Sequence, residues 1–162
     1  MADISNSDDR IDVRDVIERV EELREERADH DTERAEGEPA YVTERTADGN
    51  LTGISIDSEG KPQPGTWEAE NPAEAEELKT LESLLNDLCG YGGDHQWEGS
   101  WYPVTLIADS HFADYAKELA EDTGAVGKDN ASWLVIDWEA SAKNIRQDYA
   151  GVDYDGVMYW YR

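Results

Sequence analysis

Cysteine and long apolar runs are both scarce in this sequence. Cys89 is the single cysteine, so the chain cannot form an internal disulfide, and this composition favours a reducing compartment such as the cytoplasm. We expect Cys89 to pack as a small apolar side chain near the end of a helix. No apolar run reaches the roughly 18 residues of a membrane span, and the acidic N-terminus lacks a signal-peptide pattern. The sequence therefore predicts a soluble, cytoplasmic protein.

Basic residues are also few. Lysine and arginine number 14, five of them lysine, against 39 aspartates and glutamates, which gives a net charge of −25. Such a surface repels nucleic acid and anionic membranes and attracts basic proteins. Duplex DNA carries about one charge per 1.7 Å, so this charge corresponds to roughly 42 Å of duplex, or about 12 base pairs. Disorder and adaptation to high salt are two other causes of such a charge, and both stay open at this stage.

Motifs of catalysis and cofactor binding are missing from the sequence. It has no P-loop, no dinucleotide-binding fingerprint, no HExxH and no EF-hand loop. The three histidines, His30, His95 and His111, are scattered, and a tight loop explains the glycines at 92 and 93 better than a metal site does. No local arrangement indicates a serine or cysteine activated by a base. We therefore expect a protein that is not an enzyme and holds neither a cofactor nor a metal.

The N-terminal part, residues 1–66, is predicted to form a helical extension. Its pattern predicts a mobile segment (1–10), a helix (11 to about 28), a linker (29–40), a weak hairpin about Asp48-Gly49 (41–57) and a turn-rich segment (58–66). Glutamates and arginines alternate on the helix, which predicts stabilising pairs along it. The alternative that all of 29–66 is flexible stays open.

The remaining part, residues 67–162, is predicted to be an acidic α+β domain with small antiparallel sheets and acidic amphipathic helices. The expected elements are a helix from Pro72 to Gly90, a strand at 101–107 with Pro103 at an edge or bulge, a helix at 112–123, a strand at 133–136, a helix capped by Asp137, and a hairpin at 152–161. Tryptophans and tyrosines supply its core. Stacking on single-stranded bases would need a basic groove, which the sequence does not provide.

The helix at 112–123 has two sharply different sides. At about 100° per residue, Phe112, Tyr115, Ala116 and Leu119 share one narrow sector and predict a core-facing stripe. The carboxylates of Asp114, Glu118, Glu121 and Asp122 lie together on the far side, with Lys117 beside them. Asp109 or Ser110 is expected to cap the start of the helix, and Gly124 suits its left-handed end. A solvated polar face is the simplest explanation; the alternative is a row of negative charges with the spacing of DNA phosphates.

Two segments carry a resemblance to a known family. HFADYAKELAEDTGA (111–125) and IDWEASAKNIRQDYAGVDYDGVMYWY (136–161) resemble the C-terminal part of ArdA-type antirestriction proteins. The resemblance implies an elongated, typically dimeric, non-catalytic DNA mimic that is carried by phages or mobile elements. Such proteins occupy the DNA groove of type I restriction–modification enzymes. Residues 1–66 show no such likeness, and Lys143 and Arg146 interrupt the acidic surface of the third helix.

The resulting hypothesis is a stoichiometric inhibitor that mimics duplex DNA in the host cytoplasm. Its partner would be the DNA-binding surface of a restriction–modification enzyme, with no direct contact to nucleic acid or membrane, and a homodimer is left open. The carboxylates expected to imitate phosphates are Asp114, Glu118, Glu121, Asp122, Glu139, Asp148, Glu74, Glu77 and Asp87. Two alternatives remain: a mimic aimed at another defence nuclease, of the anti-CRISPR type, and an acidic non-mimic from a salt-adapted organism.

Overall fold

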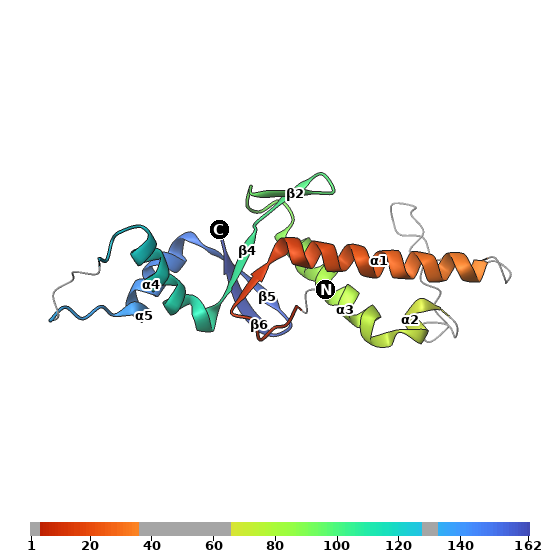
Figure 1. Ribbon diagram of the computed structural model, residues 1–162, viewed down its shortest axis with the longest axis horizontal. Helices are drawn as coiled ribbons and strands as arrows, with labels where there is room; N and C mark the ends of the chain where they lie inside the picture. Colours follow the sequence, from red (N-terminus) through yellow and green to blue (C-terminus); the bar gives the residue numbers. More distant parts are fainter. Residues whose placement is uncertain (1–3, 36–65, 128–132) are drawn as a thin grey trace. The chain divides into compact units, whose positions relative to one another are not determined.

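The computed structural model describes residues 4–35, 66–127 and 133–162 (Figure 1). The fold is α+β, as the sequence predicted. In chain order the elements are β1 (Arg10–Asp12), α1 (Val13–Ala35), α2 (Trp67–Glu70), α3 (Pro72–Leu88), β2 (His95–Trp97), β3 (Ser100–Tyr102), β4 (Thr105–Ala108), η1 (Asp109–His111), α4 (Phe112–Asp122), α5 (Trp138–Ile145), η2 (Arg146–Asp148), β5 (Ala150–Tyr154) and β6 (Val157–Tyr161). No helix among the described residues is long and apolar enough to cross a membrane.

The described residues form two compact units. The first unit contains those within 1–17 and 83–162, and the second contains those within 18–82. The predicted boundary between residues 66 and 67 does not coincide with this division, because the start of the chain supplies a strand to the sheet of the first unit. The two units are described separately below.

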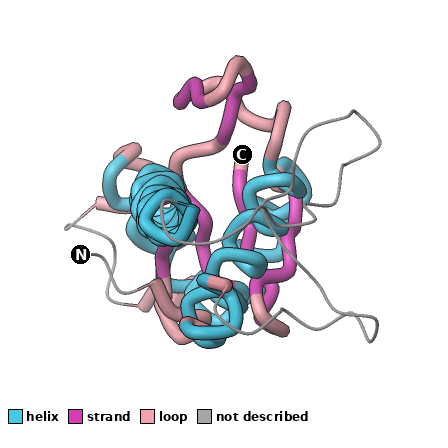
Figure 2. Tube along the Cα trace, turned by 90° about the vertical axis from the view of Figure 1, so that its right-hand side faces the viewer, coloured by secondary structure: helices cyan, strands magenta, loops and turns pink. Residues whose placement is uncertain are grey.

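A four-stranded antiparallel sheet is the centre of the first unit. Its strand order is β1-β4-β6-β5, while β2 and β3 form a separate two-stranded sheet. Figures 1 and 2 show this small hairpin standing apart from the larger sheet. The predicted C-terminal hairpin is confirmed: β5 and β6 pair along their whole length around Asp155 and Gly156. Both turn residues have positive φ, 49° and 81°, which matches the twist that a two-residue hairpin requires.

The two faces of this sheet carry different side chains, because successive residues of a strand point to opposite sides. On one face the buried residues include Ile11, Leu106, Val152 and Tyr159. On the other face Ile107 lies opposite Arg10 on one neighbour and opposite Trp160 on the other. This second face is the one that contacts α4 and α5, through the buried cluster described below.

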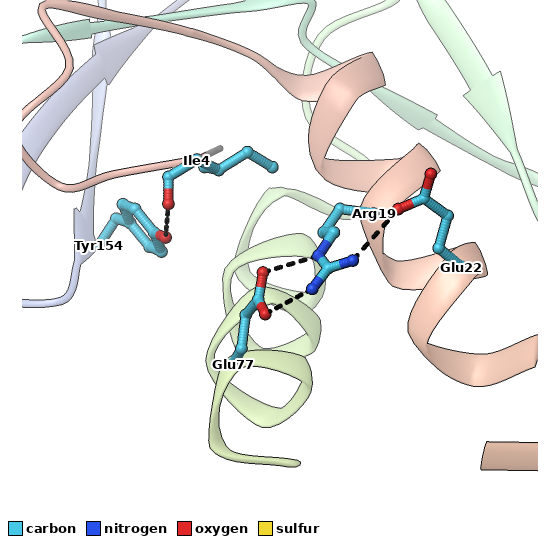
Figure 3. Close-up of polar contacts among 5 residues, drawn as sticks. All are labelled: Ile4, Arg19, Glu22, Glu77 and Tyr154. Atoms are coloured by element: carbon cyan, nitrogen blue, oxygen red, sulfur yellow. Dashed lines mark hydrogen bonds and ion pairs between the residues drawn. The ribbon is translucent and has the colours of Figure 1, made fainter. Parts of the chain in front are cut away.

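The first residues of the chain are tied to the C-terminal hairpin. The Tyr159 hydroxyl donates to the Asp8 carbonyl at 2.7 Å, and the Tyr154 hydroxyl lies 3.4 Å from the Ile4 carbonyl (Figure 3). The amide of Asn6 donates to the Asp155 carbonyl at 3.0 Å. These contacts correct the prediction of a mobile segment at 1–10 for the residues from Ile4 onward. The partners of each contact lie about 150 residues apart in the sequence, so local patterns could not predict them.

Helices α4 and α5 pack against each other over the second face of the sheet. Phe112, Ala116 and Ala142 are completely buried and meet Ile107 of β4 in one cluster. Asp137 caps α5 as predicted, accepting a hydrogen bond of 3.0 Å from the Ala140 amide. The helical spacing of apolar residues in α4 and α5 is therefore explained by a shared core, and the predicted positions of both helices are confirmed.

The second unit consists of most of α1 together with α2 and most of α3. Its buried apolar residues recur at helical spacing and include Val20, Leu23, Trp67, Leu78 and Leu81, while Thr66 and Glu68 are buried polar residues. Arginines of α1 form ion pairs with glutamates of α2 and α3, as the next section describes. The predicted helix at 72–90 is confirmed in α3, and the predicted N-terminal helix is found in α1.

Four local predictions are wrong in the described residues. The linker expected at 29–40 is helical up to Ala35, and Ile11 belongs to β1 instead of the helix. The single strand expected at 101–107 is divided at Pro103, whose missing amide hydrogen separates β3 from β4. The strand expected at 133–136 is irregular, and Trp133 and Val135 are 81% and 90% exposed, so no sheet buries this apolar run. The hairpin predicted at 41–57 lies outside the described residues.

The loop before β2 provides a stability test. Gly92 has φ of +82°, and a Cβ at this position would come within 2.6 Å of the Pro103 nitrogen, whereas a Cβ at Gly93 meets nothing within 4 Å. We expect Gly92→Ala to lower the free energy of unfolding by about 2–3 kcal/mol, through backbone strain and overlap with immobile main-chain atoms. Gly93→Ala is the matched control and should stay within about 0.5 kcal/mol of the original protein. Urea unfolding measures both, and equal effects would contradict the close approach.

Candidate partner-binding surface

Helix α4 exposes one side and buries the other. Phe112 and Ala116 have no exposed surface and anchor the helix on the sheet. The four carboxylates that the sequence places together on its far side are all exposed: Asp114, Glu118, Glu121 and Asp122. We call these four residues the acidic face of α4. The helix ends at Asp122, and the φ of +76° at Gly124 confirms the left-handed position predicted just after it.

The start of α4 is held differently from the prediction. A short 3-10 turn, η1, precedes the helix, and no side chain caps either of them. Asp109 forms an ion pair with Arg146 and accepts a hydrogen bond of 2.8 Å from the Trp160 indole nitrogen. The carboxylate expected to cap α4 therefore joins its entry to η2 and β6, two segments that follow more than 35 residues later.

The acidic face differs along its length in how its charges are compensated. Glu118 forms an ion pair with Arg10 of β1, and both side chains are about half exposed. Asp114 lies 3.7 Å from the His111 Nδ1 atom, a contact that is an ion pair only when the histidine is protonated. No ion pair within the described part of the chain reaches Glu121 or Asp122. The C-terminal turn of α4 thus presents two carboxylates that form no ion pair among the described residues.

A group of aromatic rings fixes α4 from below. The Tyr115 and Tyr149 hydroxyls share a hydrogen bond of 2.6 Å, and both rings meet the Phe112 ring edge to face at centroid distances of 5.3 Å. The guanidinium of Arg146 lies over the rings of Phe112 and Trp160, at 5.2 and 5.7 Å from their centroids. Such contacts have a preferred geometry as well as apolar area, so they orient the helix as well as attach it.

Burial and the Tyr149 hydroxyl change the acidity of this group. Burial of the Tyr115 phenol, and then its hydrogen bond to Tyr149, raise the pKa of Tyr115 to about 12. Burial likewise raises the pKa of Tyr159 to about 12. Both phenols are neutral at physiological pH, so the hydrogen bonds that they form add no charge to the sheet or to the contact with α4.

The surface of α5 is mixed in charge. Glu139 and Asp148 are exposed, as a phosphate-mimicking role requires, but a groove of about 630 Å³ beside them is also lined by Lys143, Arg146 and Trp160. Arg146 is directed onto Asp109 and two aromatic rings, so Lys143 is the more exposed of the two cations. The predicted extension of the acidic row onto α5 therefore meets one exposed lysine.

The three candidates on α3 are in different situations. Glu77 binds Arg19 of α1 through two hydrogen bonds, of 2.8 and 2.9 Å, and the Arg19 side chain is only 11% exposed (Figure 3). This pair, with Glu22 at 3.2 Å, raises the pKa of Arg19. Glu74, also in the second unit, is half-buried, whereas Asp87, in the first unit, is exposed. A carboxylate held this closely by arginine offers little charge to a partner, so the prediction that Glu77 imitates a phosphate loses its basis.

Cross-helix ion pairs recur throughout the second unit, and sequence reasoning missed them. Arg24 binds Glu82 at 2.7 Å, Arg27 lies 3.8 Å from Glu68, and His30 lies 2.8 Å from Glu70. The predicted pairing along α1 is found between Arg19 and Glu22, but Arg19, Arg24 and Arg27 also reach glutamates of α2 or α3. An arginine every three to five residues on α1, opposite a glutamate-rich helix, is the pattern that could have suggested this.

Groups suited to binding a metal ion are not assembled in the described ranges. No cluster of three or more His, Cys, Asp or Glu side chains there is placed to hold a metal ion. Cys89 is exposed, which corrects the prediction that it packs as an apolar residue. Hydrogen bonds from the Ser100 and Tyr102 side chains lower the pKa of the Cys89 thiol.

No protein-family model, curated protein or solved structure matches this chain. The resemblance noted for residues 111–125 and 136–161 accordingly remains a prediction.

The raised pKa values of Tyr115 and Tyr159 generate a pH prediction. A phenol whose pKa is higher in the folded chain contributes stability that is complete below its unfolded pKa of about 10 and is lost as the pH rises toward the folded value. We therefore expect the free energy of unfolding to fall between about pH 10 and 12, the window set by Tyr115 and Tyr159.

Replacing Tyr149 by phenylalanine tests how much its hydroxyl contributes to the raised pKa of Tyr115. The change removes the partner of the Tyr115 hydroxyl, so the pKa of Tyr115 should fall below about 12. NMR of isotope-labelled tyrosine measures the titration. Tyr91→Phe, at an exposed ring, is the control and should leave Tyr115 unchanged. An unchanged Tyr115 titration in Tyr149→Phe would show that the hydroxyl pair is not formed.

The Arg19–Glu77 pair generates a stability prediction. Glu77→Gln leaves a nearly buried guanidinium without its carboxylate, so we expect a loss of about 1–3 kcal/mol in the free energy of unfolding. Glu76→Gln on the same helix is the control. Glu76 is exposed, and its one ion pair among the described residues is a long contact of 3.8 Å to the exposed Lys79. Its effect should stay within about 0.5 kcal/mol. Equal losses in chemical denaturation would mean that Glu77 behaves as an ordinary surface acid.

Proposed function

We propose that the protein is an antirestriction DNA mimic that inhibits a type I restriction–modification enzyme by occupying its DNA-binding channel. The observation that carries this proposal is the acidic face of α4, which is exposed along its length while Phe112 and Ala116 on the opposite side of the helix are completely buried. The resemblance of residues 111–125 and 136–161 to ArdA-type proteins supports the same conclusion.

The spacing of the acidic face suits a protein surface that normally binds DNA. Its members occupy positions i, i+4, i+7 and i+8 of a helix, and neighbours at this spacing lie roughly 5–6 Å apart. Successive phosphates of one DNA strand are separated by a comparable distance. Lysines and arginines placed to contact those phosphates would therefore find carboxylates within reach.

Rigid support makes this arrangement useful for binding. Helix α4, which carries the acidic face, is attached to the sheet through Phe112 and the contacts of Asp109. The hydrogen-bonded hydroxyls of Tyr115 and Tyr149 support it as well. Charges that are already in position lose less conformational freedom when a partner binds. Charge attraction of this kind also speeds association and weakens as salt is added.

The candidates differ in how well they fit this role. Glu121 and Asp122 are the strongest, because they are exposed and uncompensated within the described chain, and Asp114 is similarly exposed. Glu118 shares its charge with Arg10, and Glu139 has Lys143 in the same groove. Asp148 and Asp87 are exposed single charges. Glu77 is left out because Arg19 neutralises it.

One observation favours the non-mimic alternative, an acidic protein of a salt-adapted organism. Helix α1 also exposes carboxylates, including Glu18, Glu25, Glu26 and Asp29, so exposed acids are not confined to the first unit. Adaptation to salt predicts unfolding at low ionic strength and no dependence of any binding event on the acidic face. A DNA mimic predicts instead that binding to the partner depends on the acidic face.

The proposal predicts the behaviour of a four-fold variant. Replacing Asp114, Glu118, Glu121 and Asp122 by Asn, Gln, Gln and Asn should weaken inhibition at least roughly 100-fold, since each carboxylate would lose a charge-assisted contact. The assay is competition between the protein and labelled duplex for a purified type I restriction enzyme. Affinity of the original protein should fall steeply with added salt, and that slope should be smaller for the variant.

A charge-matched control separates geometry from total charge. The change of Glu18, Glu25, Glu26 and Asp29 to amides removes the same number of charges from α1 and should leave inhibition within about threefold. Equal losses in the two variants would refute a specific role for α4. Protection of phage on hosts that carry one defence system at a time would show whether the target is another nuclease.

A further inference from the structure

A small cavity in the first unit gathers cations and hydroxyl groups. It has a volume of about 270 Å³ and lies beside α4 on the second face of the sheet, where Ile107 forms part of its wall. The polar side chains that line it are those of Arg10, Thr105, Tyr115, Tyr149, Arg162 and Asp94. We call it the arginine cavity. It is separate from the acidic face, although Arg10 touches both.

Two guanidinium groups line the arginine cavity from opposite ends of the sequence. Arg10 extends from β1, with its guanidinium carbon 5.6 Å from the centre of the Tyr115 ring. Arg162 follows β6 and forms no ion pair within the described residues. Since the chain has 14 basic residues against 39 acidic ones, two guanidinium groups at one cavity are a local concentration of cations, although Arg10 is paired with Glu118.

Hydroxyl groups add uncharged donors to the same cavity. The Tyr115 and Tyr149 hydroxyls are 2.6 Å apart, so one proton lies between them and the other is free to be donated elsewhere. Thr105 contributes an exposed hydroxyl from β4. Planar guanidinium groups and hydroxyls are the side-chain donors that bind phosphate oxygens best.

Size and charge together favour a small phosphate-bearing anion. The cavity volume is that of about nine waters, at about 30 Å³ each, which accommodates a phosphate group with a small substituent. A carboxylate has two oxygens and would leave part of this donor set unused. Asp94 is the opposing feature: its carboxylate lines the cavity and repels an anion.

We propose that the arginine cavity binds a small phosphate-bearing anion. Arg10 and Arg162 hold the anion, and the hydroxyls of Tyr115 and Tyr149 are the uncharged donors. Arg10 also binds Glu118, so the anion competes with Glu118 for the same guanidinium. Binding therefore releases Glu118 and adds one uncompensated charge to the acidic face. This inference depends on the cavity alone and holds whether or not the protein is a DNA mimic.

The first experiment is a titration of the full chain with inorganic phosphate by isothermal titration calorimetry, at constant ionic strength balanced with sodium chloride. Arg10→Gln and Arg162→Gln should each weaken binding at least roughly tenfold. Arg14→Gln is the matched control, because Arg14 is an exposed guanidinium paired with Asp12 and does not line the cavity. It should leave the affinity unchanged.

Two further variants test the opposing carboxylates. Asp94→Asn removes the repelling charge and Glu118→Gln removes the competitor for Arg10, so both should tighten phosphate binding about threefold or more. A titration with glycerol phosphate distinguishes the source of the anion. Tighter binding of the ester than of phosphate identifies a phosphate monoester as the ligand, and weaker binding identifies inorganic phosphate.

Side-chain NMR of the unmodified protein keeps the test independent of any effect of mutation on folding. Phosphate should shift the guanidinium resonances of Arg10 and Arg162 and leave that of Arg14 in place. The proposal is overturned if millimolar phosphate produces no such shifts, or if Arg14→Gln weakens binding as much as Arg10→Gln does. Uniform shifts of all arginines would also overturn it, since they indicate general screening.

Discussion

The scarcity of cations is the constraint on which the surface of this protein depends. With 14 basic residues for 39 acidic ones, most carboxylates cannot each have a cation of their own, and the position of each arginine decides which charges remain available. In the second unit, Arg19, Arg24 and Arg27 are used on glutamates of α2 and α3. In the first unit, no described lysine or arginine forms an ion pair with the carboxylates in the last turn of α4. The acidic residues therefore divide into those that join helices and those that face solvent.

A surface of like charges must be supported by something other than charge, because mutual repulsion opposes folding. Beneath α4 this support is aromatic: Phe112 meets Tyr115 and Tyr149 edge to face, and the two hydroxyls bind each other. Neutral phenols supply hydrogen bonds without further charge, and burial raises the pKa of Tyr115 to about 12, from an ordinary value that already leaves it neutral at physiological pH. The polar outer side of the helix and its aromatic inner side are thus two parts of one arrangement.

Local patterns in the sequence predicted those features that depend on local physics. The α4 stripe, the Asp137 cap and the Asp155-Gly156 turn are all settled within a few residues, and each is found as predicted. Partners far apart in the sequence were not predictable: Arg10 binds Glu118 across 108 positions, and Arg19 binds Glu77 across 58. The apolar run at 133–136 indicated a strand by composition, but no neighbouring strand pairs with it in the described residues.

Arg146 shows why such long-range contacts matter for function. In the sequence it interrupts an acidic surface and weakens the case for a continuous row of charge. In the folded chain its guanidinium is paired with Asp109 and covers two aromatic rings, so its charge is largely compensated and its side chain is 22% exposed. Lys143 is then the cation on α5 that a basic partner would meet. The electrostatic cost of α5 to a DNA-binding partner is accordingly closer to that of one cation than of two, and the acidic face of α4 is left intact.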